Sequence, residues 1–140
     1  MAPSDPSTPA LSGVFETVLY ADAVPETARF FQIMLGLSPL RPPTQNAAIF
    51  RLNSESMLLI FDPNWSEQSG RGAPTHGSRG PGHIALRIPG DSYEAWKAKL
   101  SSLNIPIETE VNWEHGGRSI YLRDPAGNSI ELAAGDVWGS

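Results

Sequence analysis

The chain has 140 residues, with 10 basic and 15 acidic side chains and a formal net charge of −5 at pH 7. Hydrophobic residues make up 40% and charged residues 18%, which is enough for a core and too little charge for a disordered chain. The acidic balance argues against nucleic acid or an anionic membrane as the main partner, because phosphate binding needs clustered Lys and Arg. The absence of cysteine excludes disulfides, thiolate metal sites and cysteine nucleophiles.

The composition of the N-terminal residues does not favour a secretory signal. Residues 1–12 contain three prolines among Ser and Thr, with no basic segment and no apolar core, so they predict a flexible tail rather than a secretory signal. No apolar run approaches the roughly 20 residues that a membrane span requires. We therefore expect a cytoplasmic protein that does not bind membranes.

The first half, residues 13–62, predicts one strand, one helix and three further strands. Residues 13–21 are rich in β-branched and aromatic side chains, which is typical of a strand. A helix follows, since Pro25 suits a first helical turn and Gly36 a C-terminal stop. Further strands are predicted over 37–40, 47–52 and 56–61, the last two joined by a turn at 53–55.

The second half, residues 82–134, repeats this order after a loop at 63–81 rich in Gly, Pro and Ser, which is a linker or an active-site loop. Asp91 and Glu94 have the spacing of a capping box, and apolar residues then follow at helical spacing. The predicted strands are 82–88, 105–111, 118–123 and 129–134, and residues 135–140 form a C-terminal tail.

The spacing of equivalent positions indicates a duplication. Gly36 and Asn104, which end the two helices, are 68 positions apart, and Glu16 and His83 in the two first strands are 67 apart. Two βαβββ units of nearly equal length are hard to explain by chance. The sequence therefore predicts an α+β fold in which two βαβββ modules form a curved mixed sheet around a cleft.

Strand alternation indicates which residues face that cleft, because successive side chains point to opposite faces. It leaves His83 and Glu131 on the faces opposite the apolar side chains of their strands. Alternation alone does not decide which face of the first strand points to the cleft. The duplication, however, gives Glu16 the position that His83 has in the second half. A set of two carboxylates and an imidazole suits Mn, Fe, Co, Ni or Zn.

Three segments carry a family resemblance: ETVLYADAVPETARFFQIMLGL, GPGHIALRI and YLRDPAGNSIEL. They resemble the vicinal oxygen chelate superfamily, which includes glyoxalase I, bleomycin-resistance and fosfomycin-resistance proteins, and extradiol dioxygenases. The DP-x-GN turn before a strand with a Glu is the most specific of them. The resemblance spans about residues 13–134 and implies paired βαβββ modules with a divalent metal in the cleft.

The resemblance also assigns roles to residues. Glu16, His83 and Glu131 match the metal ligands, with Glu131 also a catalytic base, whereas Leu59 stands at the usual fourth-ligand position and cannot bind a metal. This departure weakens a close glyoxalase I role and implies a three-ligand site.

Four further residues are candidates around that site. His76 could be a fourth ligand, a catalytic base or a surface residue of the loop. Arg118 could bind an anionic substrate or form a surface ion pair. Tyr121 could orient a substrate oxygen or pack across strands, and Trp113 could cap the cleft.

These features favour a glyoxalase-like metalloenzyme of the lyase or isomerase type that uses the metal as a Lewis acid on a small oxygen-chelating substrate. The alternatives are a metal-free drug-binding protein of the bleomycin-resistance type, supported by Leu59 and four Trp, and an extradiol-type dioxygenase, weakened by Glu16 in place of a His. Because the family commonly pairs modules between chains, we expect a homodimer, with pairing within or between chains left open.

Overall fold

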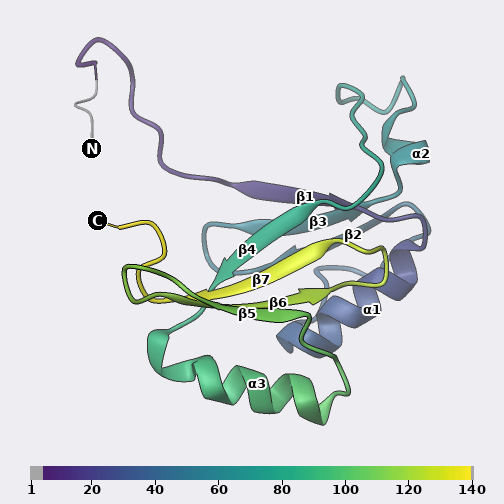
Figure 1. Cartoon of the computed structure of the whole chain (residues 1–140). Helices are drawn as coiled ribbons and strands as arrows, with labels where there is room; N and C mark the ends of the chain where they lie inside the picture. Colours follow the sequence, from purple (N-terminus) through teal and green to yellow (C-terminus); the bar gives the residue numbers. More distant parts are fainter. Residues whose placement is uncertain (1–4, 140) are drawn as a thin grey trace.

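A computed structural model describes residues 5–139 of the chain. The first four residues of the predicted N-terminal tail and Ser140 of the predicted C-terminal tail lie outside the described residues. Two mixed β-sheets lie side by side, and the helices α1 and α3 both lie on one side of them (Figure 1). The residues leading to the first strand run away from the body of the molecule. No helix in the described part of the chain is long and apolar enough to cross a membrane.

The first half forms a three-stranded sheet in the order β1-β3-β2, with β1 parallel to β3. The helix has a proline in its first turn and ends at Gly36, whose φ of 67° suits glycine. The strand predicted at 37–40 is wrong: this segment gives only one backbone bond to β2, from Leu40 N–H to the Ile49 carbonyl. The elements are β1 (Glu16–Tyr20), α1 (Val24–Leu35), β2 (Ala47–Arg51), β3 (Met57–Phe61) and the short α2 (Pro63–Ser66).

The second half forms a four-stranded sheet in the order β4-β7-β6-β5, with β4 parallel to β7. The order strand, helix, three strands agrees with the prediction. The capping box does not form, because the residue before the helix is Ser92, which makes no side-chain cap bond. The elements are β4 (His83–Arg87), a 3-10 turn (Gly90–Ser92), α3 (Tyr93–Ser102), β5 (Thr109–Asn112), β6 (Arg118–Arg123) and β7 (Ser129–Ala134).

One continuous hydrophobic core joins the two halves. Phe31 of α1 and Phe50 of β2 are fully buried in it, as are Leu100 of α3 and Leu132 of β7. The helices therefore cover one face of each sheet, and the predicted α+β fold of two sheet-and-helix modules is confirmed. We call the other side of each sheet, turned away from α1 and α3, the open face.

Asn128, in the DPAGN turn between β6 and β7, joins the two halves by one hydrogen bond and ties the start of β4 to its own turn by another. It is 2% exposed, and its Oδ1 accepts the backbone N–H of Gly82 at 2.7 Å. Its Nδ2 donates to the Tyr20 carbonyl of β1 at 3.2 Å and to Asp124 Oδ2 at 2.9 Å. The motif that carried the family resemblance is thus the point at which β1, β4 and the β6–β7 turn meet.

Tyr93 at the start of α3 is expected to titrate late in a pH titration. Its hydroxyl donates to Glu110 Oε1 at 2.8 Å, and burial together with that carboxylate raises the pKa of Tyr93 to about 12. The stability that this phenol contributes is present below about pH 10, the pKa of a free tyrosine, and is lost as the pH rises toward 12. Ultraviolet titration of Tyr93→Phe should lack the latest phenolate step, and persistence of that step contradicts the assignment.

Candidate functional site

The open face of the second sheet brings His83 and Glu131 together. On β4, the side chain of Ile84 enters the core, so His83 and Ala85 point to the open face. On β7, Glu131 pairs in register with Ala85, which is the next residue after His83 on the same face of β4. The distance between His83 Nε2 and Glu131 Oε1 is 3.3 Å.

The other ring nitrogen of His83 fixes its tautomer. His83 Nδ1 lies 3.0 Å from the Ser129 carbonyl oxygen. A carbonyl can only accept, so Nδ1 carries the hydrogen. Nε2 then either carries a second proton, giving an imidazolium paired with Glu131, or presents a lone pair to the carboxylate. Two acceptors facing each other in this way call for a cation between them.

The pair fits a divalent metal ion. Imidazole nitrogen and carboxylate oxygen bind zinc at about 2.0–2.2 Å, so two such ligands of one ion lie roughly 3.0–3.4 Å apart. The 3.3 Å separation of Nε2 and Oε1 falls within this range. Metal-binding histidines also commonly donate their second ring N–H to a backbone carbonyl, as His83 does here.

Two successive buried hydrogen bonds fix the orientation of the Glu131 carboxylate. Its side chain is 8% exposed, and its Oε2 accepts the Ser119 hydroxyl at 2.5 Å. Ser119, which is fully buried, accepts in turn from Trp113 Nε1 at 2.8 Å. Oε2 is therefore engaged, and Oε1 is the oxygen turned to His83. Ser119 was missed from the sequence, although alternation places it on the same face of β6 as Tyr121.

Tyr121 and Trp113 lie beside the pair, and their role as substrate contacts stays a prediction. The Tyr121 ring stacks on the His83 ring, with ring centroids 6.3 Å apart. Tyr121 also pairs in register with Glu131 across β6 and β7. Burial and the Glu131 carboxylate raise the pKa of Tyr121. With Trp113, Arg87 and the C-terminal Trp138, these residues line an open cavity of about 550 Å³.

Glu16, the third predicted ligand, lies on the open face of the first sheet. Leu19 of the same strand is buried in the core, so Glu16 points to the opposite face, where it is exposed. Among residues 5–139, no three His, Asp or Glu side chains gather into one metal-binding cluster. Within this chain, Glu16 therefore does not join His83 and Glu131.

The sheet register supports the predicted correspondence between the two halves. Leu59 pairs with Val18, two residues after Glu16, as Glu131 pairs with Ala85, two residues after His83. Leu59 is 8% exposed and has no metal-binding atom. The first sheet thus offers one carboxylate where the second offers an imidazole and a carboxylate.

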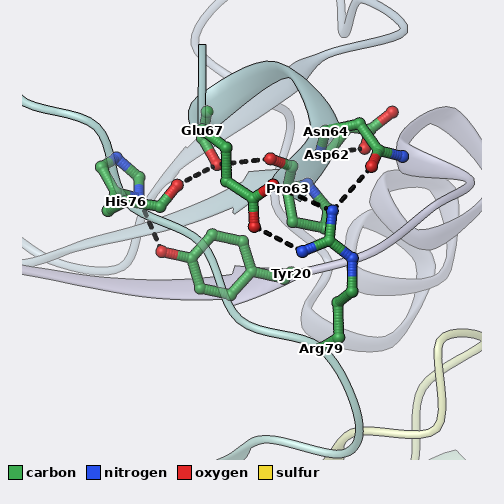
Figure 2. A network of polar contacts seen from close by, with 8 residues as sticks. Tyr20, Asp62, Pro63, Asn64, Glu67, His76 and Arg79 are labelled. Atoms are coloured by element: carbon green, nitrogen blue, oxygen red, sulfur yellow. Dashed lines mark hydrogen bonds and ion pairs between the residues drawn. The ribbon is translucent and has the colours of Figure 1, made fainter. Parts of the chain in front are cut away.

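His76 belongs to a separate network on the long loop. Its Nδ1 lies 2.6 Å from the Tyr20 hydroxyl, and its carbonyl accepts from Ser66 Oγ at 2.7 Å (Figure 2). No hydrogen bond or ring contact joins it to His83 or Glu131 among the described residues. Its predicted role as a base or ligand stays a prediction, and the observed contacts are those of a loop anchor.

The same loop is held down by Arg79, which sequence reasoning did not single out. Its guanidinium forms a two-pronged ion pair with Glu67 and donates to Asn64 Oδ1 at 2.7 Å (Figure 2). The pairing lowers the pKa of Glu67. Asp62 caps the N-terminus of the unpredicted helix α2, because its carboxylate accepts the Asn64 N–H. The loop is thereby an ordered segment beside β1.

Arg118 lies on the other face of β6. It shares the face of Ile120 and Leu122, which are buried in the core beneath α3. Its guanidinium lies 3.8 Å over the Tyr93 ring and its Nη2 lies 3.4 Å from Glu94 Oε1. The structure therefore removes Arg118 from the substrate side, and the predicted anion contact is corrected to a surface ion pair.

Comparison with solved structures finds a relative above 30% identity. The crystal structure of lactoylglutathione lyase from Agrobacterium tumefaciens shares 34% identity, over 93% of this chain and 98% of that one, with a TM-score of 0.86. A glyoxalase/bleomycin resistance protein from Catenulispora acidiphila shares 16% identity over 86% of this chain and 96% of its own, with a TM-score of 0.65.

A glyoxalase/bleomycin resistance protein/dioxygenase from Nocardioides shares 17% identity over 96% of this chain and 92% of its own, with a TM-score of 0.73. These two more distant likenesses show the fold alone. No family model matches the sequence, and no curated protein matches it. On its identity and coverage with the Agrobacterium protein, the chain belongs to the glyoxalase/bleomycin resistance/dioxygenase family, the vicinal oxygen chelate superfamily.

Proposed function

We propose that the chain is a metal-dependent enzyme of the lyase or isomerase type that acts on a small molecule with chelating oxygens. The observation that carries the proposal is the pair His83 Nε2 and Glu131 Oε1, 3.3 Å apart in an open cavity. The name of the Agrobacterium protein, a lactoylglutathione lyase, supports this reaction class. The donor atoms suit Mn, Fe, Co, Ni or Zn.

An ion held by His83 and Glu131 would supply Lewis-acid polarisation of a substrate oxygen. His83 is oriented for this by the bond from Nδ1–H to the Ser129 carbonyl. Glu131 Oε1 would hold the ion, and because Oε2 is engaged by Ser119, Oε1 could accept a substrate proton only when it is not bound to the ion. Tyr121, whose pKa is raised by burial and by Glu131, keeps its proton at neutral pH and can donate it in a hydrogen bond to a substrate oxygen.

We propose a homodimer because the third predicted ligand, Glu16, lies away from His83 and Glu131 within one chain. Glu16 is exposed on the open face of β1, and it does not meet His83 and Glu131 among the described residues of one chain. A second copy can present its Glu16 to the cavity, which would complete a site of two carboxylates and an imidazole. The substrate site is then shared between two chains.

A metal-free binding protein is the second candidate. It is favoured by Leu59 at the position equivalent to Glu131 and by the two tryptophans, Trp113 and Trp138, in the cavity wall. In that case His83 would carry both ring protons and pair with Glu131 as an imidazolium. Metal content separates the two candidates.

Elemental analysis of protein purified without chelator or nickel resin tests the proposal. We expect about one transition-metal equivalent per wild-type chain. His83→Ala should retain almost none, because it lacks the only imidazole among the three proposed ligands. His115→Ala, at an exposed histidine outside the cavity, is the matched control and should keep its metal. Equal metal in wild type and His83→Ala contradicts the site. No metal in either, and no uptake of added Zn²⁺, selects the metal-free candidate.

A further inference from the structure

The cavity beside Glu131 has a second polar end, at Arg87. We propose that it binds substrates with an oxygen pair at one end, a flat apolar middle, and a carboxylate at the other end that pairs with Arg87. The oxygen-pair end rests on the proposed function. The carboxylate end rests on contacts of Arg87 alone and can be tested separately.

The spacing on two neighbouring strands creates room for such a molecule. Along the open face of β4, His83 and Arg87 are separated by Ala85, which places the two polar residues roughly 13 Å apart along the strand. On β7, Ala133 follows Glu131 on the same face and pairs in register with Arg87. Two alanines therefore form the floor between the polar ends of the cavity.

The walls of this space are aromatic. Trp113 and Tyr121 line it on the β5–β6 side, and Trp138, which is 90% exposed, lies at its rim. The Trp113 indole is fixed by its bond to Ser119, so its ring position is set before a ligand enters. Such surfaces favour a flat apolar group, which can stack against them.

The charge at the far end favours an anion. Arg87 donates from Nη1 to the Gly135 carbonyl, which orients the guanidinium without neutralising it. No carboxylate of the described residues forms an ion pair with Arg87. Its remaining N–H groups are available for a two-pronged contact with a carboxylate, the geometry that a guanidinium matches best. Arg87 is the only Arg or Lys that lines this cavity in the described chain.

Calorimetric titration of the Zn²⁺-loaded protein with three probes tests the inference. The probes are 3-(3,4-dihydroxyphenyl)propanoate, which has all three features, 4-methylcatechol, which lacks the carboxylate, and 3-phenylpropanoate, which lacks the oxygen pair. We expect the dihydroxy acid to bind wild type about tenfold more tightly than 4-methylcatechol, the gain of one charged contact. Arg87→Met should abolish this ratio and leave 4-methylcatechol affinity unchanged.

The matched control is Arg51→Met, which removes an exposed arginine from β2 in the other sheet and should keep the tenfold ratio. The inference is overturned if Arg87→Met keeps the ratio, if it weakens both catechols equally, or if wild type does not bind the dihydroxy acid. His83→Ala tests the other end, because it should abolish the advantage of the dihydroxy acid over 3-phenylpropanoate. An unchanged advantage there counts against the proposed function and leaves the Arg87 contact standing.

Discussion

Mixing two variants that each lack a proposed ligand, Glu16→Ala and His83→Ala, is expected to restore metal binding. Each variant alone lacks one ligand in every site. In a mixed dimer, the chain with intact Glu16 faces the chain with intact His83 and Glu131, so one of the two sites is complete. With random exchange of subunits, Zn²⁺ capacity should return to roughly a quarter of the wild-type value. Equilibrium dialysis after brief mild unfolding and refolding of the mixture measures it.

A control mixture shows whether the recovered binding comes from ligands on two different chains. His83→Ala mixed with Glu131→Gln should recover nothing, because both residues serve the same half-site. Recovery is equally absent if Glu16 and His83 act within one chain, since every chain in the mixture is then defective. A mixture that stays without metal, or a protein that sediments as a monomer with full metal content, contradicts the shared site.

Asn128→Ala is expected to cost roughly 2–4 kcal/mol of unfolding free energy. The Asn128 side chain is buried, and its removal takes a hydrogen-bond partner from the Gly82 N–H and from Asp124 Oδ2. Asp124 Oδ1 keeps the backbone N–H groups of residues 126 and 128. The substitution also removes the hydrogen bond to the Tyr20 carbonyl, which is the one of the three bonds that joins the second half to the first. Urea denaturation followed by circular dichroism measures the change.

Asn112→Ala is the control, because Asn112 lies exposed on the outer strand β5, and it should shift stability by no more than about 0.5 kcal/mol. If the two alanine variants unfold at the same urea concentration, Asn128 does not hold the halves together. The DPAGN turn would then serve only the local connection between β6 and β7.

The sequence predicted most elements because each half has a clear pattern of apolar spacing ended by turn residues. The strand at 37–40 failed for a local reason. Pro39, Pro42 and Pro43 remove backbone donors from this segment, so it cannot form a ladder with β2 beyond the single bond of Leu40. Helix α2 was missed because one turn is too short to show a helical period.

Within the site, the period of two was enough to place His83 beside Glu131, since both lie in one sheet with a fixed register. It could not bring Glu16 to them, because the relation between two sheets depends on packing rather than on alternation. Arg118 was misplaced although its spacing from Ile120 and Leu122 gave the buried face. Attention to that alternation would also have pointed to Ser119.

We propose that His83 Nε2 and Glu131 Oε1 bind one divalent cation. Nitrogen-detected NMR of the ¹⁵N-labelled imidazoles during Zn²⁺ titration tests it at the atom concerned. The account predicts that Nε2 of His83 shifts on metal addition while Nδ1 keeps its proton on the Ser129 carbonyl, and that His76 and His115 do not change. A His83 ring that stays doubly protonated or unchanged at saturating Zn²⁺ would contradict the account.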